Sequence, residues 1–282
     1  MYDCILVPVD GSEAGDRAVA YAFTLAKYAG ATVHGLYVDD TVATPDDAPD
    51  SLADLETVGE TVLDTFTEQG RTAGITTVRA HRQGDPIAEI NRYADEHTID
   101  LIVVGRHPER GLERFLKRGI ARQLMQSVRI SILSVPESTS STSEFDAVLF
   151  ATDGREAATQ AERHALYIAK NADALLQVVY VLNTRLAKSG ALHEALEREG
   201  ERVTKKAELR AIQRDVNTVA SVLEGRPSRE ILEHARANGS DLLVVGTGNR
   251  RGLDQFVVGS VATHVVAESD RPVLVVPAET RP

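Results

Sequence analysis

Short apolar runs alternate with longer amphipathic stretches along the whole chain of 282 residues. Runs that are rich in β-branched residues and too short for helices predict strands, in the first half over 4–9, 31–38, 101–105 and 130–136. Apolar residues at helical spacing predict helices between them, roughly over 14–29, 51–73 and 87–96. Alternating strands and helices predict right-handed crossovers and a parallel sheet covered on both faces. The expected fold class is therefore α/β, doubly wound and Rossmann-like, with about five strands in each sheet.

The pattern occurs twice because the chain repeats itself. Residues 2–40 match 145–183 at a constant shift of 143, and residues 84–105 match 225–246 at a shift of 141. A difference of two residues in the loop between these segments accounts for the change of shift. Self-similarity of this kind predicts duplicated structural units.

The stretch ESTSSTSE, at 137–144, is polar and contains no apolar residue. Such a composition is typical of a linker, and the alternative is a loop within one continuous domain. Because strand signals end just before this stretch and restart just after it, the sequence predicts two domains, 1–136 and 145–282.

Charge and cysteine content exclude several classes of protein. A net charge of −11 argues against electrostatically driven binding of nucleic acid, which needs a basic face. The single cysteine, Cys4, cannot form an internal disulfide and is expected to be a buried strand residue. No apolar run approaches the roughly 20 residues that span a bilayer, and the chain starts directly with a strand. We therefore expect a cytoplasmic protein with no membrane partner.

Ligands of doubly wound sheets bind at the carboxyl ends of the strands, where the strand order reverses. In the second half, the loop after the fourth predicted strand reads GTGNRRGLDQFVVGSVATHVV, from Gly246 to Val266. Its glycines allow tight turns, and Gly259 and Ser260 open a helix whose free N–H groups attract phosphate. The alternative is that these glycines serve only the turn. The loop matches neither the P-loop nor G-x-G-x-x-G.

Together with the Asp-Gly turn after the first strand, this loop resembles the universal stress protein family, over nearly the whole chain and twice. Members of that family that bind ATP carry G-x-x-G, nine residues, and then G-S/T. The matching residues here are Gly246, Asn249, Gly259 and Ser260, with Asn249 standing where the family has its second glycine. Asparagine tolerates left-handed backbone better than most residues, which is what that position requires.

The resemblance implies an ATP site in the second half, with or without Mg²⁺. Adenine and ribose would be held by Ala151, Thr152, Asp153 and Val181. The phosphates would be held by Gly246, Thr247, Gly248, Asn249, Arg251, Gly252, Gly259, Ser260 and Val261. Asp153 would accept hydrogen bonds from ribose or adenine, and the alternative is an aspartate that only holds its own turn.

The first half keeps only part of this pattern. Its weaker candidate residues are Pro8, Val9, Asp10, Val38 and Gly105. Its loop, GRHPERGLERFLKRG, places Pro108 at the second glycine position and Arg118-Gly119 where Gly-Ser is expected. Proline removes a backbone donor, so we expect weak or no ATP binding here. The alternative is a basic site for another anion, formed by Arg106, Arg110, Arg114 and Arg118.

The expected function is that of a regulatory protein that binds or senses ATP in its C-terminal copy. The alternative is a protein-interaction module of the same fold that binds no nucleotide. No catalytic or metal-binding spacing is present, so an enzyme is not expected, and any ATP hydrolysis would be slow and incidental. The resemblance also implies an intramolecular pseudo-dimer through the last strands, over 130–135 and 272–276, a further pairing of two chains, and a regulatory protein partner.

Overall fold

The computed structural model describes residues 1–40, 52–106, 120–127, 130–139, 143–185, 189–247 and 259–278. The chain divides into two compact units, Met1–Ser143 and Glu144–Pro282.

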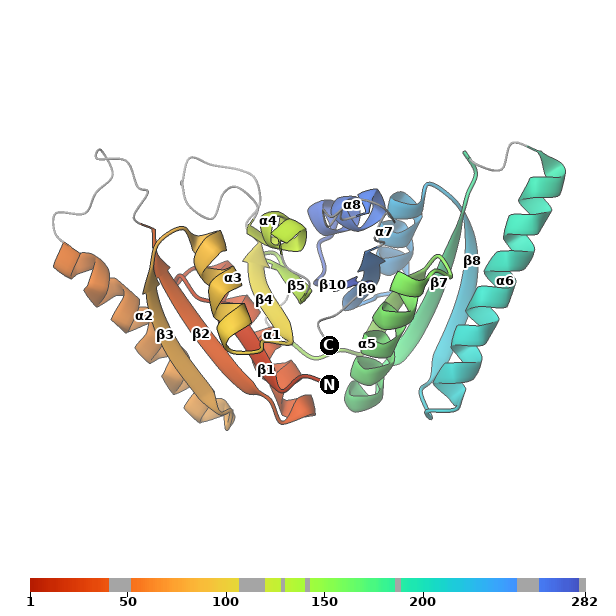
Figure 1. Ribbon diagram of the computed structural model, residues 1–282. Coiled ribbons are helices and arrows are strands. Elements are labelled where there is room, and N and C mark those ends of the chain that lie inside the picture. The colour runs from red at the N-terminus through yellow and green to blue at the C-terminus, as the bar shows by residue number, and fades with distance from the viewer. Residues whose placement is uncertain are drawn as a thin grey trace. The chain divides into compact units, whose positions relative to one another are not determined.

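The first unit alternates strands with helices throughout (Figure 1). Its elements are β1 Cys4–Pro8, α1 Glu13–Ala29, β2 Thr32–Asp39, α2 Leu52–Ala73, β3 Thr77–Gln83, α3 Pro86–Glu96, β4 Leu101–Arg106, α4 Ile120–Ser127 and β5 Ser131–Pro136. The strand order is β3-β2-β1-β4-β5, and each of these neighbouring pairs is parallel. The order reverses at β1, which lies between β2 and β4.

The second unit repeats this plan. Its elements are β6 Ala147–Thr152, α5 Glu156–Ala172, β7 Leu175–Asn183, α6 Gly190–Ile212, β8 Thr218–Gly225, α7 Pro227–Ala237, β9 Leu242–Thr247, α8 Ser260–Glu268 and β10 Val273–Pro277. The order β10-β9-β6-β7-β8 again places the first strand at the reversal point, with parallel neighbours on both sides. The predicted fold class, two doubly wound parallel sheets of five strands, is confirmed.

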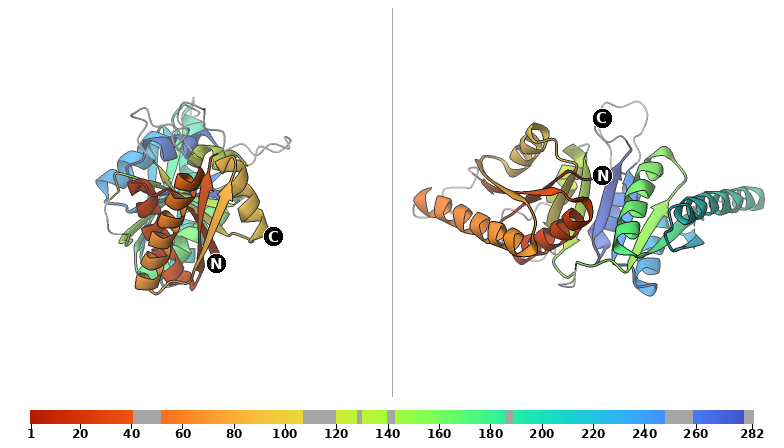
Figure 2. Two further views of the ribbon diagram at one scale, coloured as in Figure 1. Left: turned by 90° about the vertical axis from the view of Figure 1, so that its left-hand side faces the viewer. Right: turned by 90° about the horizontal axis from the view of Figure 1, so that it is seen from below.

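Each sheet forms the core of its unit because helices cover both of its faces. In the first unit α1 packs against α2 and α3 packs against α4, and in the second unit α7 packs against α8. The long helix α6 lies along β7 and β8, as Figures 1 and 2 show. The central strands of a covered parallel sheet are buried on both faces, which explains runs such as LIVVG and LLVVG.

Two details refine the sequence interpretation. Cys4 is the first residue of β1, as expected of a strand residue, but it is only half-buried, because it lies at the end of the strand. Within the linker, Ser143 shares a 2.6 Å hydrogen bond between hydroxyl groups with Thr24 of α1, so this end of the linker is tied to the first unit. No helix among the described residues is long and apolar enough to cross a membrane.

Candidate functional site

In the second unit, the turn after β6 brings together four residues that the structure describes. Gly154 has a φ of 76°, which lets the chain turn directly into α5. Its N–H donates to the Thr152 hydroxyl at 3.1 Å, and the Arg155 N–H donates to Oδ1 of Asp153 at 3.0 Å. Asp153 therefore holds its own turn while its exposed carboxylate also faces solvent.

The corresponding turn of the first unit is closed more tightly. Oδ1 of Asp10 accepts from both the N–H and the hydroxyl of Ser12, at 3.0 and 2.6 Å. The Ser12 hydroxyl in turn accepts from the Gly15 N–H at 3.1 Å and caps α1. In the second unit Arg155 occupies the position of Ser12, and no side chain caps α5.

Replacing Arg155 by serine is expected to stabilise the protein by about 1 kcal/mol, since an N-cap hydroxyl satisfies an orphan N–H of the helix. Removing a cation from a helix N-terminus acts in the same direction. Urea unfolding of Arg155→Ser beside the wild type measures the gain. A variant that unfolds at a lower urea concentration would mean that Arg155 makes a stabilising contact which outweighs the missing cap.

The ends of the second strands differ little between the units. Val181 of β7 is half-buried and pairs with Leu223, whereas the ladder between β6 and β7 ends at Thr152 and Tyr180. The backbone of Val181 therefore lies beyond the ladder on the side that faces β6, where a ligand could reach it. This arrangement suits the backbone contact to adenine that the family resemblance implies.

In the first unit, Val38 has the same position and pairs with Arg82. Pro8 ends β1, and the N–H of Val9 donates to the Leu36 carbonyl at 2.9 Å. The carboxyl end of β1 is thus hydrogen-bonded to β2 one residue beyond the strand.

Gly246 in β9 and Gly105 in β4 each lie where the strand packs against the first helix of its unit. A Cβ atom on Gly246 would lie 2.7 Å from the carbonyl oxygen of Ala157, and a Cβ atom on Gly105 would lie 2.5 Å from that of Ala14. The contacted atoms belong to the backbones of α5 and α1, and backbone atoms cannot move aside as a flexible side chain can. Both glycines are therefore required by helix-to-strand packing, whatever their part in binding a ligand.

The residues next to Gly246 are only partly described. Thr247 is buried, and its hydroxyl donates to the Val276 carbonyl at 3.4 Å, so its side chain faces β10. Ala151 is half-buried within β6. Four predicted phosphate-binding residues, Gly248, Asn249, Arg251 and Gly252, lie outside the described residues, as do 107–119 of the first unit, including Pro108, Arg110, Arg114 and Arg118.

Helix α8 begins at the carboxyl edge of the second sheet with an uncapped N-terminus. Gly259 is its N-cap residue, with φ −61° and ψ 143°, and no side chain caps the helix. The first bond to the Gly259 carbonyl comes from the Thr263 N–H at 3.1 Å. Ser260 is exposed and Val261 is 36% exposed, so the first turn of α8 lies at the surface of the described part of the unit. Such N–H groups, with the positive end of the helix dipole, favour an anion.

Tyr180 lies one residue before Val181 and remains neutral near pH 7. Burial raises the pKa of its phenol, and the carboxylates of Glu199 and Asp153 raise that pKa further against the opposing effect of Arg155.

Among the described residues, no group of three His, Cys, Asp or Glu side chains could hold a metal ion. His264 bonds through Nδ1 to the Ser260 carbonyl at 2.6 Å, within its own helix.

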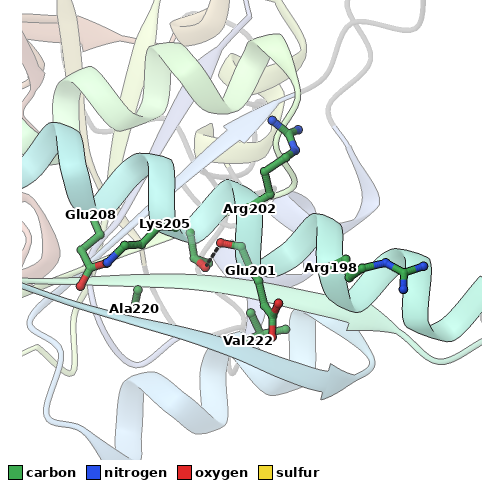
Figure 3. A pocket seen from close by; sticks show the side chains of 8 residues that line it. Arg198, Glu201, Arg202, Lys205, Glu208, Ala220 and Val222 are labelled. Atoms are coloured by element: carbon green, nitrogen blue, oxygen red, sulfur yellow. Dashed lines mark hydrogen bonds and ion pairs between the residues drawn. The ribbon is translucent and has the colours of Figure 1, made fainter.

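A shallow hollow of about 610 Å³ lies over α6 and β8 (Figure 3). Its charged side chains are of both signs, three cations and two carboxylates, and Lys205 pairs with Glu208 at 2.6 Å. Figure 3 shows Ala220 and Val222 beneath these side chains, with Arg202 extending away from them. None of the residues predicted from the sequence lines this hollow, and its mixed charges give it no preference for an anion.

The structure also reveals a groove of which the sequence interpretation included only Thr152. It lies between α5 and α6, beside the turn after β6, and has a volume of about 210 Å³. Its charged lining residues are Arg155, Glu162, Arg202, Lys206 and Arg210. The sequence contained a signal for this groove, because basic residues recur at every fourth position from Arg198 to Arg214.

The fold and this site define a tandem doubly wound α/β protein with its candidate ligand-binding edge at the point where each strand order reverses. The model of the universal stress protein family matches residues 1–136 and again residues 144–277. The chain belongs to the universal stress protein family, and it carries the family's domain twice.

Similar proteins agree with this assignment. Universal stress protein MJ0531 of Methanocaldococcus jannaschii is 35% identical over 136 residues, which are 46% of this chain and 80% of that protein. Universal stress protein YxiE of Bacillus subtilis is 28% identical over 47% of this chain and 99% of its own length. The crystal structure of a universal stress protein from Archaeoglobus fulgidus has a TM-score of 0.72 at 20% identity and covers 98% of both chains. That last likeness is one of fold, and it extends over both units.

Proposed function

We propose that this protein binds ATP in its second unit and acts as a nucleotide-sensing regulator in a stress response. The observation that carries the proposal is the N-terminus of α8, which has glycine at its N-cap and no capping side chain. The three phosphates of ATP are negatively charged, and the chain as a whole is acidic. Binding them therefore requires a local set of hydrogen-bond donors, such as the free backbone N–H groups at this helix N-terminus.

The rest of the site supports a nucleotide rather than a bare phosphate. The Asp153 carboxylate is exposed beside the turn after β6, and carboxylates are suitable acceptors for ribose hydroxyls or the adenine amino group. The backbone of Val181 lies beyond the β6–β7 ladder, where it can contact a base. Asp153 directly follows β6, which neighbours β9, the strand that precedes α8 in the chain. Val181 belongs to β7, on the other side of β6.

The first unit supports the proposed asymmetry through its sequence. Its loop replaces the Gly-Ser pair by Arg118-Gly119 and carries Pro108, so we propose that it binds ATP weakly or not at all. Bound ATP is then a signal held by one unit, and not the substrate of a reaction. ATP hydrolysis above background that disappears in Asp153→Ala would contradict this regulatory role.

Calorimetric titration of ATP into the wild type and Gly259→Arg tests the proposal. Arginine is the residue of the first unit at this position. We expect about one ATP per chain for the wild type and at least about tenfold weaker binding for the variant, because the side chain occupies the approach to the N–H groups. Parallel titrations with ADP, AMP and a cyclic nucleotide establish which phosphate chain the site prefers.

The variant is expected to fold, since a Cβ atom on Gly259 meets no atom of the described residues within 4 Å. The matched control is Gly190→Arg, which adds the same charge at the start of α6, where a Cβ atom also meets no atom within 4 Å. Equal losses in both variants would assign the effect to net charge. A wild type that binds no nucleotide would favour the alternative function, an interaction module that works without one.

A further inference from the structure

The groove between α5 and α6 has a counterpart in the first unit, and the two differ in charge. The counterpart lies between α1 and α2, has a volume of about 220 Å³, and is lined by carboxylates at Asp10 and Asp16 with no cationic side chain among the described residues. The groove of the second unit, at about 210 Å³, is lined by four cationic side chains and one carboxylate. Two copies of one fold therefore present the same hollow with opposite charge.

Three of the four cations come from a single row of residues, and the fourth is Arg155 in the turn after β6. Positions four apart carry Arg198, Arg202, Lys206 and Arg210 along α6, and Arg214 follows two residues after the helix ends. The same positions of α2, at the repeat shift of 141, carry Thr57, Thr61, Thr65, Gln69 and Ala73. Like charges four residues apart oppose helix formation, and ion pairs of Arg198 with Glu194 and of Arg202 with Glu199 offset part of this cost within α6.

An ion pair between a buried glutamate and a half-exposed arginine holds one side of the groove in place. Glu162 of α5 is 5% exposed and accepts two hydrogen bonds from Arg210, at 2.6 Å from Nε and 2.7 Å from Nη2. The equivalent residue of α1 is Val19, so the pair belongs to the second unit alone. This bidentate contact joins α5 to α6 and neutralises Arg210.

The remaining cations are available to a ligand. Arg202 pairs with Glu199 and Arg155 lies 3.6 Å from Asp153, but these side chains are exposed, and exposed pairs are weak. Lys206 has no ion pair among the residues that the structure describes. The uncapped N-terminus of α5 adjoins the same groove, through Gly154 and Arg155.

We infer that this groove is a second anion site, which takes a compact polyphosphate and is separate from the N-terminus of α8. Two guanidinium groups, one ammonium group and the start of a helix converge on a space of about 210 Å³, which suits pyrophosphate or tripolyphosphate. The same chemistry is present in the phosphate tail of a nucleotide, so the experiment has to separate these two sources.

The test is calorimetric titration of pyrophosphate and tripolyphosphate into the full chain at low and high salt. The variant is Arg202→Thr with Lys206→Thr, which installs the residues of the first unit and keeps the Glu162–Arg210 pair. The matched control is Arg198→Thr with Arg214→Ala, which also installs first-unit residues and removes two charges from the same row outside the groove.

We expect the wild type to bind polyphosphate, the groove variant to bind it about tenfold more weakly, and the control to stay within about twofold. Gly259→Arg is expected to retain polyphosphate binding, and the groove variant to retain ATP binding. Failure of the ATP proposal therefore leaves this inference standing, and the reverse also holds.

Three results would overturn the inference. A wild type that binds neither anion at low salt excludes the site. Equal losses in the variant and the control would show that the charges of α6 are only solvated. If the groove variant loses ATP and polyphosphate together, the groove is the phosphate end of the nucleotide site and not a separate one.

Discussion

Acidification from pH 7 to pH 5 is expected to lower the free energy of unfolding by about 2 kcal/mol through His164 alone. His164 lies in α5 and is 7% exposed. Its burial, together with the positive charge of Arg163, lowers the pKa of the imidazole from 6.5 to about 4. The folded protein therefore keeps His164 neutral at a pH where the unfolded chain protonates it.

The direction of the effect follows from the lowered pKa. Below pH 6.5 the unfolded chain binds a proton that the folded protein does not, so acid favours unfolding. The contribution of His164 to stability is complete above the unfolded pKa, is lost as the pH falls, and levels off below pH 4 after a total of about 3 kcal/mol. A buried neutral histidine thus destabilises the fold only on the acidic side.

Urea unfolding of the wild type and His164→Gln, at intervals from pH 8 to pH 4.5, measures this contribution. Between pH 7.5 and pH 8 the difference between the two proteins should stay constant, which provides the internal control for any contact that glutamine fails to make. Below pH 6.5 the wild type should lose stability faster than the variant. Equal slopes over the acidic range would show that His164 is protonated in the folded protein.

Most of the fold was predictable because its signals are local and occur twice. The helix expected over 87–96 is α3, Pro86–Glu96, with Asp85 as its N-cap and proline in its first turn. The strand expected over 101–105 is β4, Leu101–Arg106. Buried parallel strands need continuous apolar runs, and α1 needs an apolar stripe, so the hydrophobic pattern alone defines these elements.

The candidate site was less predictable, because one residue type serves several purposes. Asp153 was open to two interpretations, as a ligand acceptor or as a turn residue, and the structure shows both Asp153 and its counterpart Asp10 holding their turns. The packing role of Gly105 depends on how closely α1 approaches β4. That distance is a property of the tertiary structure, so hydrophobic periodicity carries no signal for it.

Comparison of the two halves with each other would have revealed the basic groove. The copies agree at the residues that build the fold, such as Gly59 and Gly200, whose missing Cβ atoms make room for Tyr37 and Tyr180. They disagree along the row of α6 that begins at Arg198. Duplication frees one copy to change wherever packing does not constrain it, so the cations that line the groove of the second unit alone point to a function that only this unit performs.

Replacing Gly105 by alanine is expected to destabilise the first unit by about 2 kcal/mol. The new Cβ atom would lie 2.5 Å from the carbonyl carbon and oxygen of Ala14 and 2.9 Å from the N–H nitrogen of Gly15. All three are backbone atoms at the start of α1, so the helix has to move as a whole. The entropy that alanine removes from the unfolded chain offsets less than about 1 kcal/mol of this cost. Thermal and urea unfolding of Gly105→Ala beside the wild type measure it.

Gly246→Ala and Gly259→Ala complete the comparison within the second unit. The Cβ atom at Gly246 meets the Ala157 backbone at 2.7 Å, so a similar loss of stability is expected, whereas at Gly259 it meets nothing within 4 Å and stability should be unchanged. Gly105→Ala at wild-type stability would show that α1 shifts freely over β4. If Gly246→Ala kept its stability and lost only ATP binding, that glycine would be needed for the ligand and not for the approach of α5. The three variants together therefore separate glycines that helix packing requires from the one that leaves an anion room to bind.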